Sequence, residues 1–256
     1  TPNDAYDYDS VQVPVLVDRE WRGEQRKLML WANRNGYFYV LDRTNGKFLL
    51  GKPFVKVNWA SGLDDNGRPI PTPQPEGAAT YPGNQGGTNW YPPSYSPRTG
   101  LFYFSAWEDY ATIYAPLEQE YEEGSAFLGG GFTVQTPVHG APTIGIGRYT
   151  PINDWTDVVG YGSLKAIDPE TGDAKWTFDQ FDVSDAGMLT TASDLLFTGG
   201  REGYFYALDA RNGKELFKVN LGGQIVMAPV TFMVDGTQYV TVTSGNAMAT
   251  FAVRGK

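Results

Sequence analysis

Two nearly identical stretches decide how this chain folds: Gly36-Tyr-Phe-Tyr-Val-Leu-Asp42-Arg-Thr-Asn-Gly46-Lys and Gly203-Tyr-Phe-Tyr-Ala-Leu-Asp209-Ala-Arg-Asn-Gly213-Lys. Each stretch predicts a β-hairpin. The apolar and aromatic residues before the aspartate suit a strand. Asp suits the first position of a turn, and Gly suits the turn position that needs a positive φ. A third, more divergent copy surrounds Asp168.

The spacing of these copies indicates a repeat architecture. Asp168 and Asp209 lie 41 residues apart, which fits the ~40–45 residues of a four-stranded propeller blade. Asp42 and Asp168 lie 126 residues apart, so an insertion or an extra unit separates them. We therefore predict an all-β fold, a β-propeller of four-stranded antiparallel blades.

Four blades can be traced along the chain. They cover about residues 10–52, 88–178, 186–220 and 224–254. The second is interrupted by an inserted loop at residues 108–161, which is expected to lie over one face of the propeller, because loops this long are usually functional or mobile. The last blade is one strand short. Unpaired strands at both ends of the series predict a missing partner segment, since propellers protect such edges by closing their ring.

Composition excludes several classes of function. The chain has 256 residues, a net charge of −9 and no cysteine. The negative charge disfavours nucleic acids and anionic lipid surfaces as partners. The absence of cysteine excludes disulfides and thiolate zinc sites, and no apolar run approaches the ~18 residues of a membrane-spanning helix. His139 is the only histidine and lacks the companions of a zinc site, so no metal ligand is assigned.

Three segments in series resemble the C-terminal half of the quinoprotein methanol and ethanol dehydrogenases. They are Thr1-Pro-Asn-Asp-Ala-Tyr-Asp7, Ala32-Asn-Arg34-Asn-Gly36 and Gly86-Gly-Thr-Asn89-Trp90-Tyr-Pro-Pro. The resemblance covers essentially the whole chain and implies about half of an eight-bladed propeller. It also implies a periplasmic location and the cofactor pyrroloquinoline quinone (PQQ), which lies on the central axis beside Ca²⁺ or a lanthanide ion.

The resemblance assigns site residues one at a time. Arg34 matches the basic residue that donates hydrogen bonds to the reactive quinone oxygens, so it is expected to bind the cofactor and to act in catalysis. A cation there stabilises the negative charge that develops as hydride reaches the quinone. Asn89 matches an asparagine at the polar edge of the cofactor, and Trp90 is expected to pack near the same pocket. Read without the family, Arg34 is a surface turn residue in a salt bridge.

Two departures from the family pattern concern the same pocket. Family members often carry a tryptophan where Asp185 precedes Ala186-Gly187, and many end the last blade with Gly-Trp where this chain has Gly245-Asn246. Asp185, Gly245 and Asn246 are therefore expected at the cofactor pocket, which they make more polar. Both changes bear on pocket shape and on the class of substrate.

The implied activity is the oxidation of primary alcohols or related polyols to aldehydes, with electrons passed to a c-type cytochrome or another acceptor. In the family the catalytic base and the metal ligands precede the position that matches Thr1, so the chain is expected to need the missing N-terminal half of the propeller and to be inactive alone. The alternative is a non-catalytic propeller that serves as a scaffold, similar to outer-membrane assembly propellers. A scaffold has no need of Arg34 and Asn89 at the axis.

Overall fold

The structure is a computed structural model that describes residues 1–75, 77–116, 118–125, 127, 130–134 and 160–252. Throughout this part the regular structure consists of β-strands alone, so the predicted all-β class is confirmed. Nothing in the described ranges forms a helix able to cross a bilayer. His139 and much of the predicted insertion lie outside the described residues.

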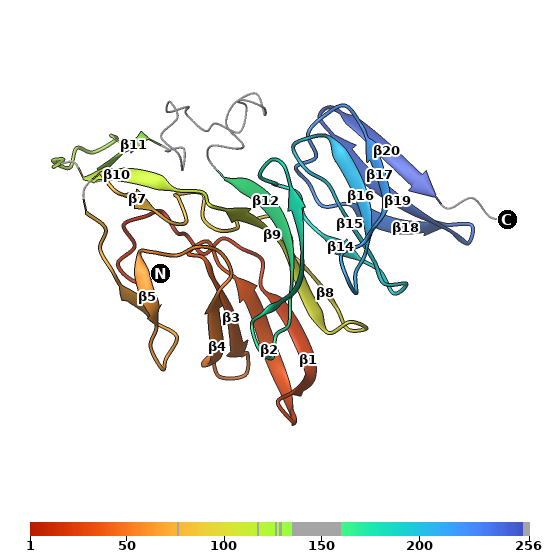
Figure 1. Cartoon of the computed structure of the whole chain (residues 1–256), viewed down its shortest axis with the longest axis horizontal. Helices are drawn as coiled ribbons and strands as arrows, with labels where there is room; N and C mark the ends of the chain where they lie inside the picture. Colours follow the sequence, from red (N-terminus) through yellow and green to blue (C-terminus); the bar gives the residue numbers. More distant parts are fainter. Residues whose placement is uncertain (76, 117, 126, 128–129, 135–159, 253–256) are drawn as a thin grey trace.

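In the described part of the chain, four of the antiparallel sheets follow one another (Figure 1). Their neighbouring strands are consecutive in each sheet, apart from the second sheet, where β9 pairs with β12. The first sheet contains β1 (Val15–Trp21), β2 (Glu24–Ala32), β3 (Tyr37–Asp42) and β4 (Lys47–Pro53); the second β8 (Ser94–Ser96), β9 (Leu101–Glu108), β12 (Tyr161–Ile167) and β13 (Ala174–Gln180); the third β14 (Leu189–Thr190), β15 (Leu195–Thr198), β16 (Tyr204–Asp209) and β17 (Glu215–Asn220); the fourth β18 (Val230–Val234), β19 (Thr237–Ser244) and β20 (Ala247–Ala252).

The hairpin turns have the chemistry that the repeats predict. Gly46 and Gly213 both have φ of 74°, and each donates its N–H to the carbonyl of the aspartate four residues earlier at 2.8 Å. The carboxylate of Asp209 accepts hydrogen bonds from the Arg211 side chain and N–H, which lower its pKa to about 2. An ionised aspartate and a glycine in the left-handed region therefore close each hairpin.

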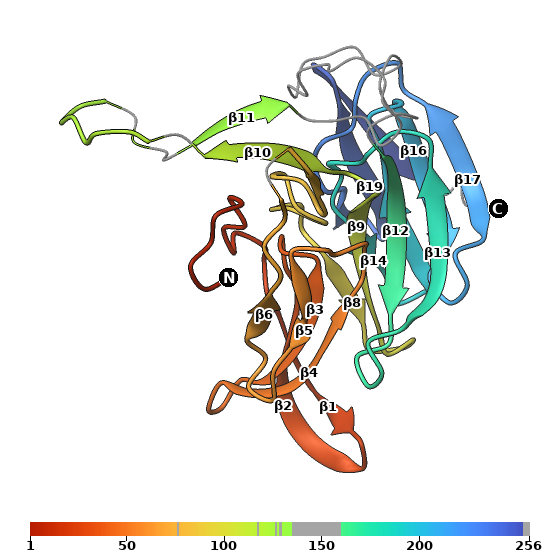
Figure 2. The ribbon, with the colours of Figure 1, turned by 60° about the vertical axis from the view of Figure 1, so that its left-hand side comes forward.

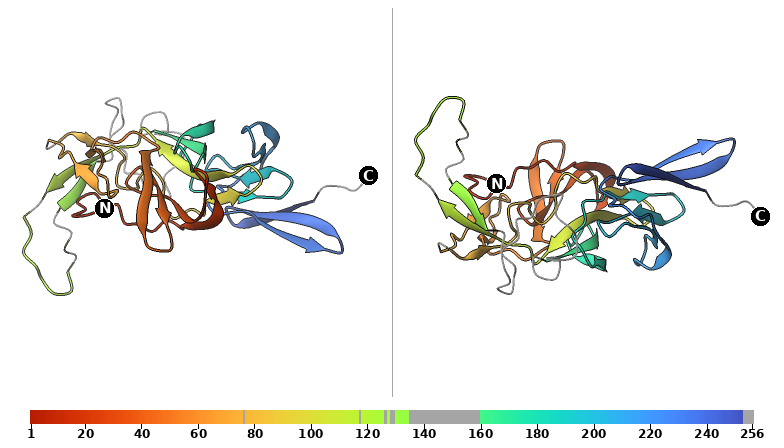
Figure 3. Two further views of the ribbon diagram at one scale, coloured as in Figure 1. Left: turned by 90° about the horizontal axis from the view of Figure 1, so that it is seen from below. Right: turned by 90° about the horizontal axis from the view of Figure 1, so that it is seen from above.

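Successive sheets pack face to face and share hydrophobic clusters between them. Phe38 and Leu30 of the first sheet pack against Phe102 and Phe104 of the second. Burying one such side chain contributes roughly 1.5–3 kcal/mol. The second and third sheets share a cluster around Leu164 and Leu208, and the third and fourth share one around Phe205 and Val242. Figure 3 shows the fourth sheet at the end of this series.

Two predicted strands are shorter than expected, and proline explains both. We predict a strand near residues 91–96, but β8 covers only Ser94–Ser96, because Pro92 and Pro93 cannot donate to a ladder. We predict a strand near residues 225–232, but β18 begins at Val230, directly after Pro229.

The chain between β9 and β12 leaves the second sheet. Its described part forms a hairpin of β10 (Thr112–Pro116) and β11 (Gly130–Val134), which pairs with β7 (Ala79–Thr80) and projects from the four sheets (Figure 2). A two-stranded sheet of β5 (Ala60–Leu63) and β6 (Pro69–Pro71) lies between the first and second sheets in sequence. The loop that leads from β7 to β8 carries several of the residues discussed next.

Candidate cofactor site

Arg34 lies in the turn between β2 and β3, and its guanidinium is buried rather than surface-exposed: the residue is 7% exposed. The two flanking asparagines build this turn. Asn33 Oδ1 accepts the N–H of Asn35, and Asn35 Oδ1 accepts the N–H of Tyr37. Such side-chain turns fix the backbone locally, so the backbone that carries the Arg34 side chain is held in place.

The guanidinium of Arg34 has partners from two other segments. Its Nη2 donates to Asp7 Oδ2 at 2.9 Å and to the main-chain oxygen of Asn84. Its Nε is buried and has no hydrogen-bond partner within the described part of the chain. A buried donor without a partner is costly, so Arg34 retains the capacity to donate to a bound oxygen acceptor.

The loop of residues 83–90 links the Arg34 turn to the second sheet by hydrogen bonds. The N–H of Gly87 donates to the carbonyl of Arg34 at 2.9 Å, and the N–H of Trp107 in β9 donates to the carbonyl of Gly87 at 2.8 Å. Gly86 has φ of +83°, and a Cβ at this position would lie 2.3 Å from Arg34 Cγ and 2.6 Å from its carbonyl oxygen. Only glycine allows the loop to pass so close to Arg34.

Replacing Gly86 with alanine is therefore expected to displace Arg34 and to lower the free energy of unfolding by about 2–3 kcal/mol, because strain at positive φ adds to a backbone clash. Gly23→Ala is the matched control. Gly23 has φ of +81°, but a Cβ there would meet nothing within 4 Å, so only the strain of ~1 kcal/mol remains. Urea unfolding measures both variants, and equal losses would show that the close approach to Arg34 is unimportant.

Asn84 and Tyr110 form the next layer of the site. The Tyr110 hydroxyl donates to Asn84 Oδ1 at 2.6 Å, and the N–H of Asn84 donates to Thr112 Oγ1 at 3.0 Å. Burial raises the pKa of Tyr110 to about 12, although the Thr112 hydroxyl and the cations Arg34 and Arg201 act to lower it. Tyr110 therefore keeps its proton at neutral pH and acts as a hydrogen-bond donor.

The buried ion pair of Arg201 and Asp185, from loops that flank the third sheet, lies beside these residues. The pair is grouped with Asp7, Arg34, Asn84, Trp107 and Tyr110 as the Arg34 cluster. Arg201 donates from Nε and Nη2 to Asp185 Oδ2, at 2.9 and 2.8 Å, and Tyr91 donates its hydroxyl to Asp185 Oδ1. The Arg201 guanidinium lies 5.2 Å from the ring centroid of Trp107. The side chains of Arg201 and Asp185 are 4% and 6% exposed. Both carboxylate oxygens of Asp185, a predicted pocket residue, thus accept hydrogen bonds from the protein itself.

The other predicted site residues are placed differently. Asn89 is buried, but its side chain accepts the N–H of Trp90 and donates to the carbonyl of Gln85, so it braces its own loop. The Trp90 ring packs on Tyr91, with centroids 5.2 Å apart. Gly245 and Asn246 lie in the exposed turn between β19 and β20. The N–H of Gly245 donates to the carbonyl of Gln224 at 2.8 Å.

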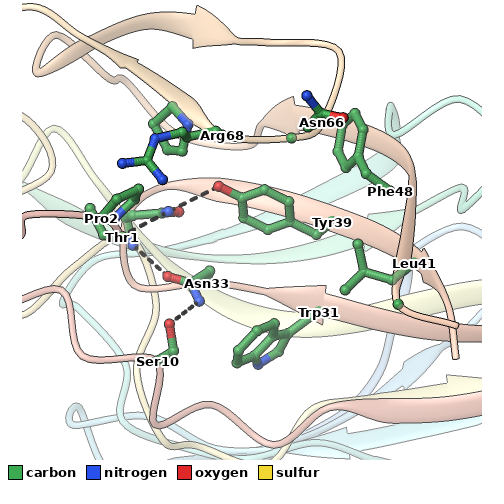
Figure 4. Close-up of a pocket in the computed structure, with 14 residues that line it drawn as sticks. Thr1, Pro2, Ser10, Trp31, Asn33, Tyr39, Leu41, Phe48, Asn66 and Arg68 are labelled. Atoms are coloured by element: carbon green, nitrogen blue, oxygen red, sulfur yellow. Dashed lines mark hydrogen bonds between the residues drawn. The ribbon is translucent and has the colours of Figure 1, made fainter.

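A separate groove of about 340 Å³ lies against the first sheet (Figure 4). Trp31, Tyr39 and Phe48 line it, together with residues of the β5–β6 hairpin and the N-terminal segment. Asn33, next to Arg34, contributes to it and donates to Ser10 Oγ at 2.8 Å. Arg34 is not among the lining residues, so the groove is distinct from the Arg34 cluster.

The Arg34 cluster combines two buried guanidiniums with the protonated hydroxyl of Tyr110 and several aromatic rings. Charge-assisted donors in a desolvated site suit an anionic, oxygen-rich and planar ligand, and this donor set fits a quinone cofactor. In the described part of the chain, no group of three or more His, Asp or Glu side chains could hold a metal ion. Sequence reasoning missed Asp7, Asn84, Tyr110 and Arg201 as members of the cluster.

Two family models match the chain. A model described as the β-propeller domain of glucose, ethanol and alcohol dehydrogenases matches residues 1–61. A model described as outer membrane protein assembly factor BamB matches residues 160–255.

Curated relatives and solved structures that resemble the chain include quinoprotein dehydrogenases. The chain is 38% identical to the quinoprotein alcohol dehydrogenase PedH of Pseudomonas putida, over 96% of the chain and 40% of that protein. It is 38% identical to the 1-butanol dehydrogenase (cytochrome c) of Thauera butanivorans, over 96% of the chain and 35% of that protein. The quinohemoprotein alcohol dehydrogenase structure from Comamonas testosteroni matches with a TM-score of 0.78 and 34% identity, over 97% of this chain and 36% of that chain. A europium-containing methanol dehydrogenase matches with a TM-score of 0.76 and 31% identity, over 94% of this chain and 40% of that chain.

These comparisons confirm the resemblance to quinoprotein alcohol dehydrogenases and the β-propeller fold. The similarity extends along nearly the whole chain. The chain spans only between 35% and 40% of the length of the relatives named here.

Proposed function

We propose that this chain forms part of a PQQ-dependent dehydrogenase that oxidises primary alcohols or related polyols to aldehydes. The observation that carries the proposal is Arg34: a buried guanidinium on a rigid turn, with a buried Nε that has no partner in the described part of the chain. It lies in a chain whose relatives are quinoprotein alcohol dehydrogenases.

In this proposal Arg34 binds and orients the cofactor. When bound, PQQ supplies the acceptor for the hydride that leaves the carbinol carbon. Arg34 donates hydrogen bonds to the quinone oxygens and, as a permanent cation, stabilises the negative charge that develops there. Asn89 and Trp90 hold the loop beside it, and Asp185, Gly245 and Asn246 make the surroundings of the pocket more polar. Burial of the cluster excludes water from the charge that Arg34 stabilises.

The remaining parts of the site are proposed to come from outside this chain. They are the catalytic base, the ligands of a Ca²⁺ or lanthanide ion, and the rest of the propeller. We propose that the four sheets are successive blades, and that further blades cover the fourth sheet, where Phe232 and Met233 of β18 are 44% and 63% exposed. By analogy with the cytochrome c named for one relative, a c-type cytochrome in the periplasm is the proposed electron acceptor.

The test is reconstitution. The chain alone, with PQQ and Ca²⁺ or a lanthanide ion added, is expected to show no dye-linked oxidation of ethanol or butanol. The same chain completed with the missing part of a relative's propeller is expected to bind PQQ, seen by its absorbance, and to oxidise alcohol. A completed propeller that binds no PQQ would overturn the proposed function. Turnover by the chain alone would show that the base and metal ligands are misplaced.

A non-catalytic scaffold is the second candidate, and the match of residues 160–255 to an assembly factor favours it. A scaffold propeller predicts no PQQ binding by the completed protein and no effect of Arg34 substitutions beyond stability. The same reconstitution therefore separates the two functions.

A further inference from the structure

Arg34 and the Asp185–Arg201 pair lie in loops of different sheets but belong to one connected network. Arg34 Nη2 donates to the main-chain oxygen of Asn84, and Asn84 Oδ1 accepts the hydroxyl of Tyr110 at 2.6 Å. The rings of Tyr110 and Trp107 meet edge to face, with centroids 5.1 Å apart. The Arg201 guanidinium covers the Trp107 ring at 5.2 Å.

Each link in this network is held at both sides. The Trp107 indole N–H donates to the carbonyl of Ser184 at 3.0 Å, directly before Asp185. Arg201 is locked by two hydrogen bonds to one carboxylate oxygen of Asp185. Tyr110 and Trp107 are 1% and 2% exposed. Close-packed groups of this kind have few alternative arrangements, so a shift at one end is transmitted to the other.

Apolar side chains could occupy the place of the Asp185–Arg201 ion pair. A buried ion pair contributes little net stability compared with apolar side chains of similar volume, so stability alone does not account for it. What the pair supplies is orientation: a planar cation fixed by two hydrogen bonds defines the position of the ring beneath it. Tyr110 lies at the middle of the network, where the charges of Arg34 and Arg201 both act to lower its pKa.

We propose that Asp185 and Arg201 are positioning residues for Arg34, acting through Trp107, Tyr110 and Asn84. This inference rests on the proposed function only for the identity of the ligand that Arg34 binds. It assigns Asp185 a role different from direct contact with the cofactor, and it assigns roles to Arg201 and Tyr110 that the sequence does not suggest.

The test cuts the network at its centre and at its end. Tyr110→Phe removes one hydroxyl and keeps the ring. The double variant Asp185→Leu/Arg201→Met removes the pair without leaving a lone buried charge. Tyr103→Phe is the control, because Tyr103 is equally buried and its hydroxyl donates to the carbonyl of Ala210, outside the network. Each variant is made in the completed propeller, alone and with Arg34→Ala.

In the completed propeller, Tyr110→Phe is expected to weaken PQQ binding roughly three- to tenfold, as for one lost hydrogen bond, and the double variant to weaken it by a similar factor. Neither is expected to weaken binding further when Arg34 is already alanine, because both act through Arg34. Tyr103→Phe is expected to leave PQQ affinity unchanged. Losses that multiply with that of Arg34→Ala, or no loss in either variant while Arg34→Ala weakens binding, would overturn the inference.

A second readout needs no cofactor and so separates this inference from the proposed function. In the chain alone, the crystal structure or the NMR signal of the Arg34 Nε–H group reports the position of the guanidinium. We expect Tyr110→Phe and the double variant to release the contact between Arg34 and Asn84, with Tyr103→Phe unchanged. An unaltered Arg34 in both variants would overturn the inference, whether or not the completed propeller binds PQQ.

Discussion

Replacing Arg201 with alanine is expected to lower the free energy of unfolding by about 3–5 kcal/mol, the usual result of leaving one charge of a buried pair without its partner. Asp185 then keeps only the Tyr91 hydroxyl among the side-chain donors described for it. The Trp107 ring also loses the cation that covers it. Chemical denaturation of the chain, followed by tryptophan fluorescence, measures the change.

The chain offers a closely matched control. Arg98 donates from Nε and Nη2 to Asp194, which resembles the pairing of Arg201 with Asp185, but the Arg98 side chain is 57% exposed. Arg98→Ala is expected to change stability little, since solvent screens exposed pairs. Asp185→Leu/Arg201→Met is expected to recover most of the stability lost in Arg201→Ala. A loss for Arg201→Ala no larger than for Arg98→Ala would contradict the buried pairing.

The fold could be predicted from the sequence because it is written locally and repeatedly. The segments around Asp42 and Asp209 contain their strands, their turn aspartate and their turn glycine within a dozen residues, and the structure places these hairpins in the first and third sheets. Where a strand was predicted too long, as before Ser94, the cause was also local: prolines interrupt the ladder.

The site could be predicted only in part, because its contacts join residues far apart in the sequence. The Arg34 turn shows itself through the flanking asparagines, but nothing near Arg34 announces Asp7 or Asn84 as its partners. Arg201 follows two glycines, and nothing in this local sequence indicates that its side chain is buried. Its burial depends on Asp185 and on Trp107, which come from other segments and meet only after the second and third sheets pack.

Arg34→Ala in the completed propeller is expected to lower kcat/KM for alcohol oxidation. The expected loss of transition-state stabilisation is about 2–4 kcal/mol, because a desolvated cation at a site of developing negative charge acts mainly on the transition state. Arg34→Lys is expected to lose less, since the charge survives while the planar fork, and with it the Nε donor, is lost. PQQ affinity should fall in both variants, and more in the alanine variant.

The ion pair between Arg34 and Asp7 allows the catalytic effect to be separated from a structural one. Asp7 is a partner of Arg34, and its side chain is 45% exposed, so Asp7→Asn removes the pairing charge but keeps an amide oxygen that can accept the same hydrogen bond. If Arg34 serves only to fix residues 1–12, then Asp7→Asn and Arg34→Ala should lower the thermal midpoint alike and leave turnover unchanged. If Arg34 binds the quinone, Arg34→Ala should abolish most turnover while Asp7→Asn retains it, because a guanidinium released from Asp7 still presents its donors to the cofactor. Equal kinetics in the two variants would remove Arg34 from the active site.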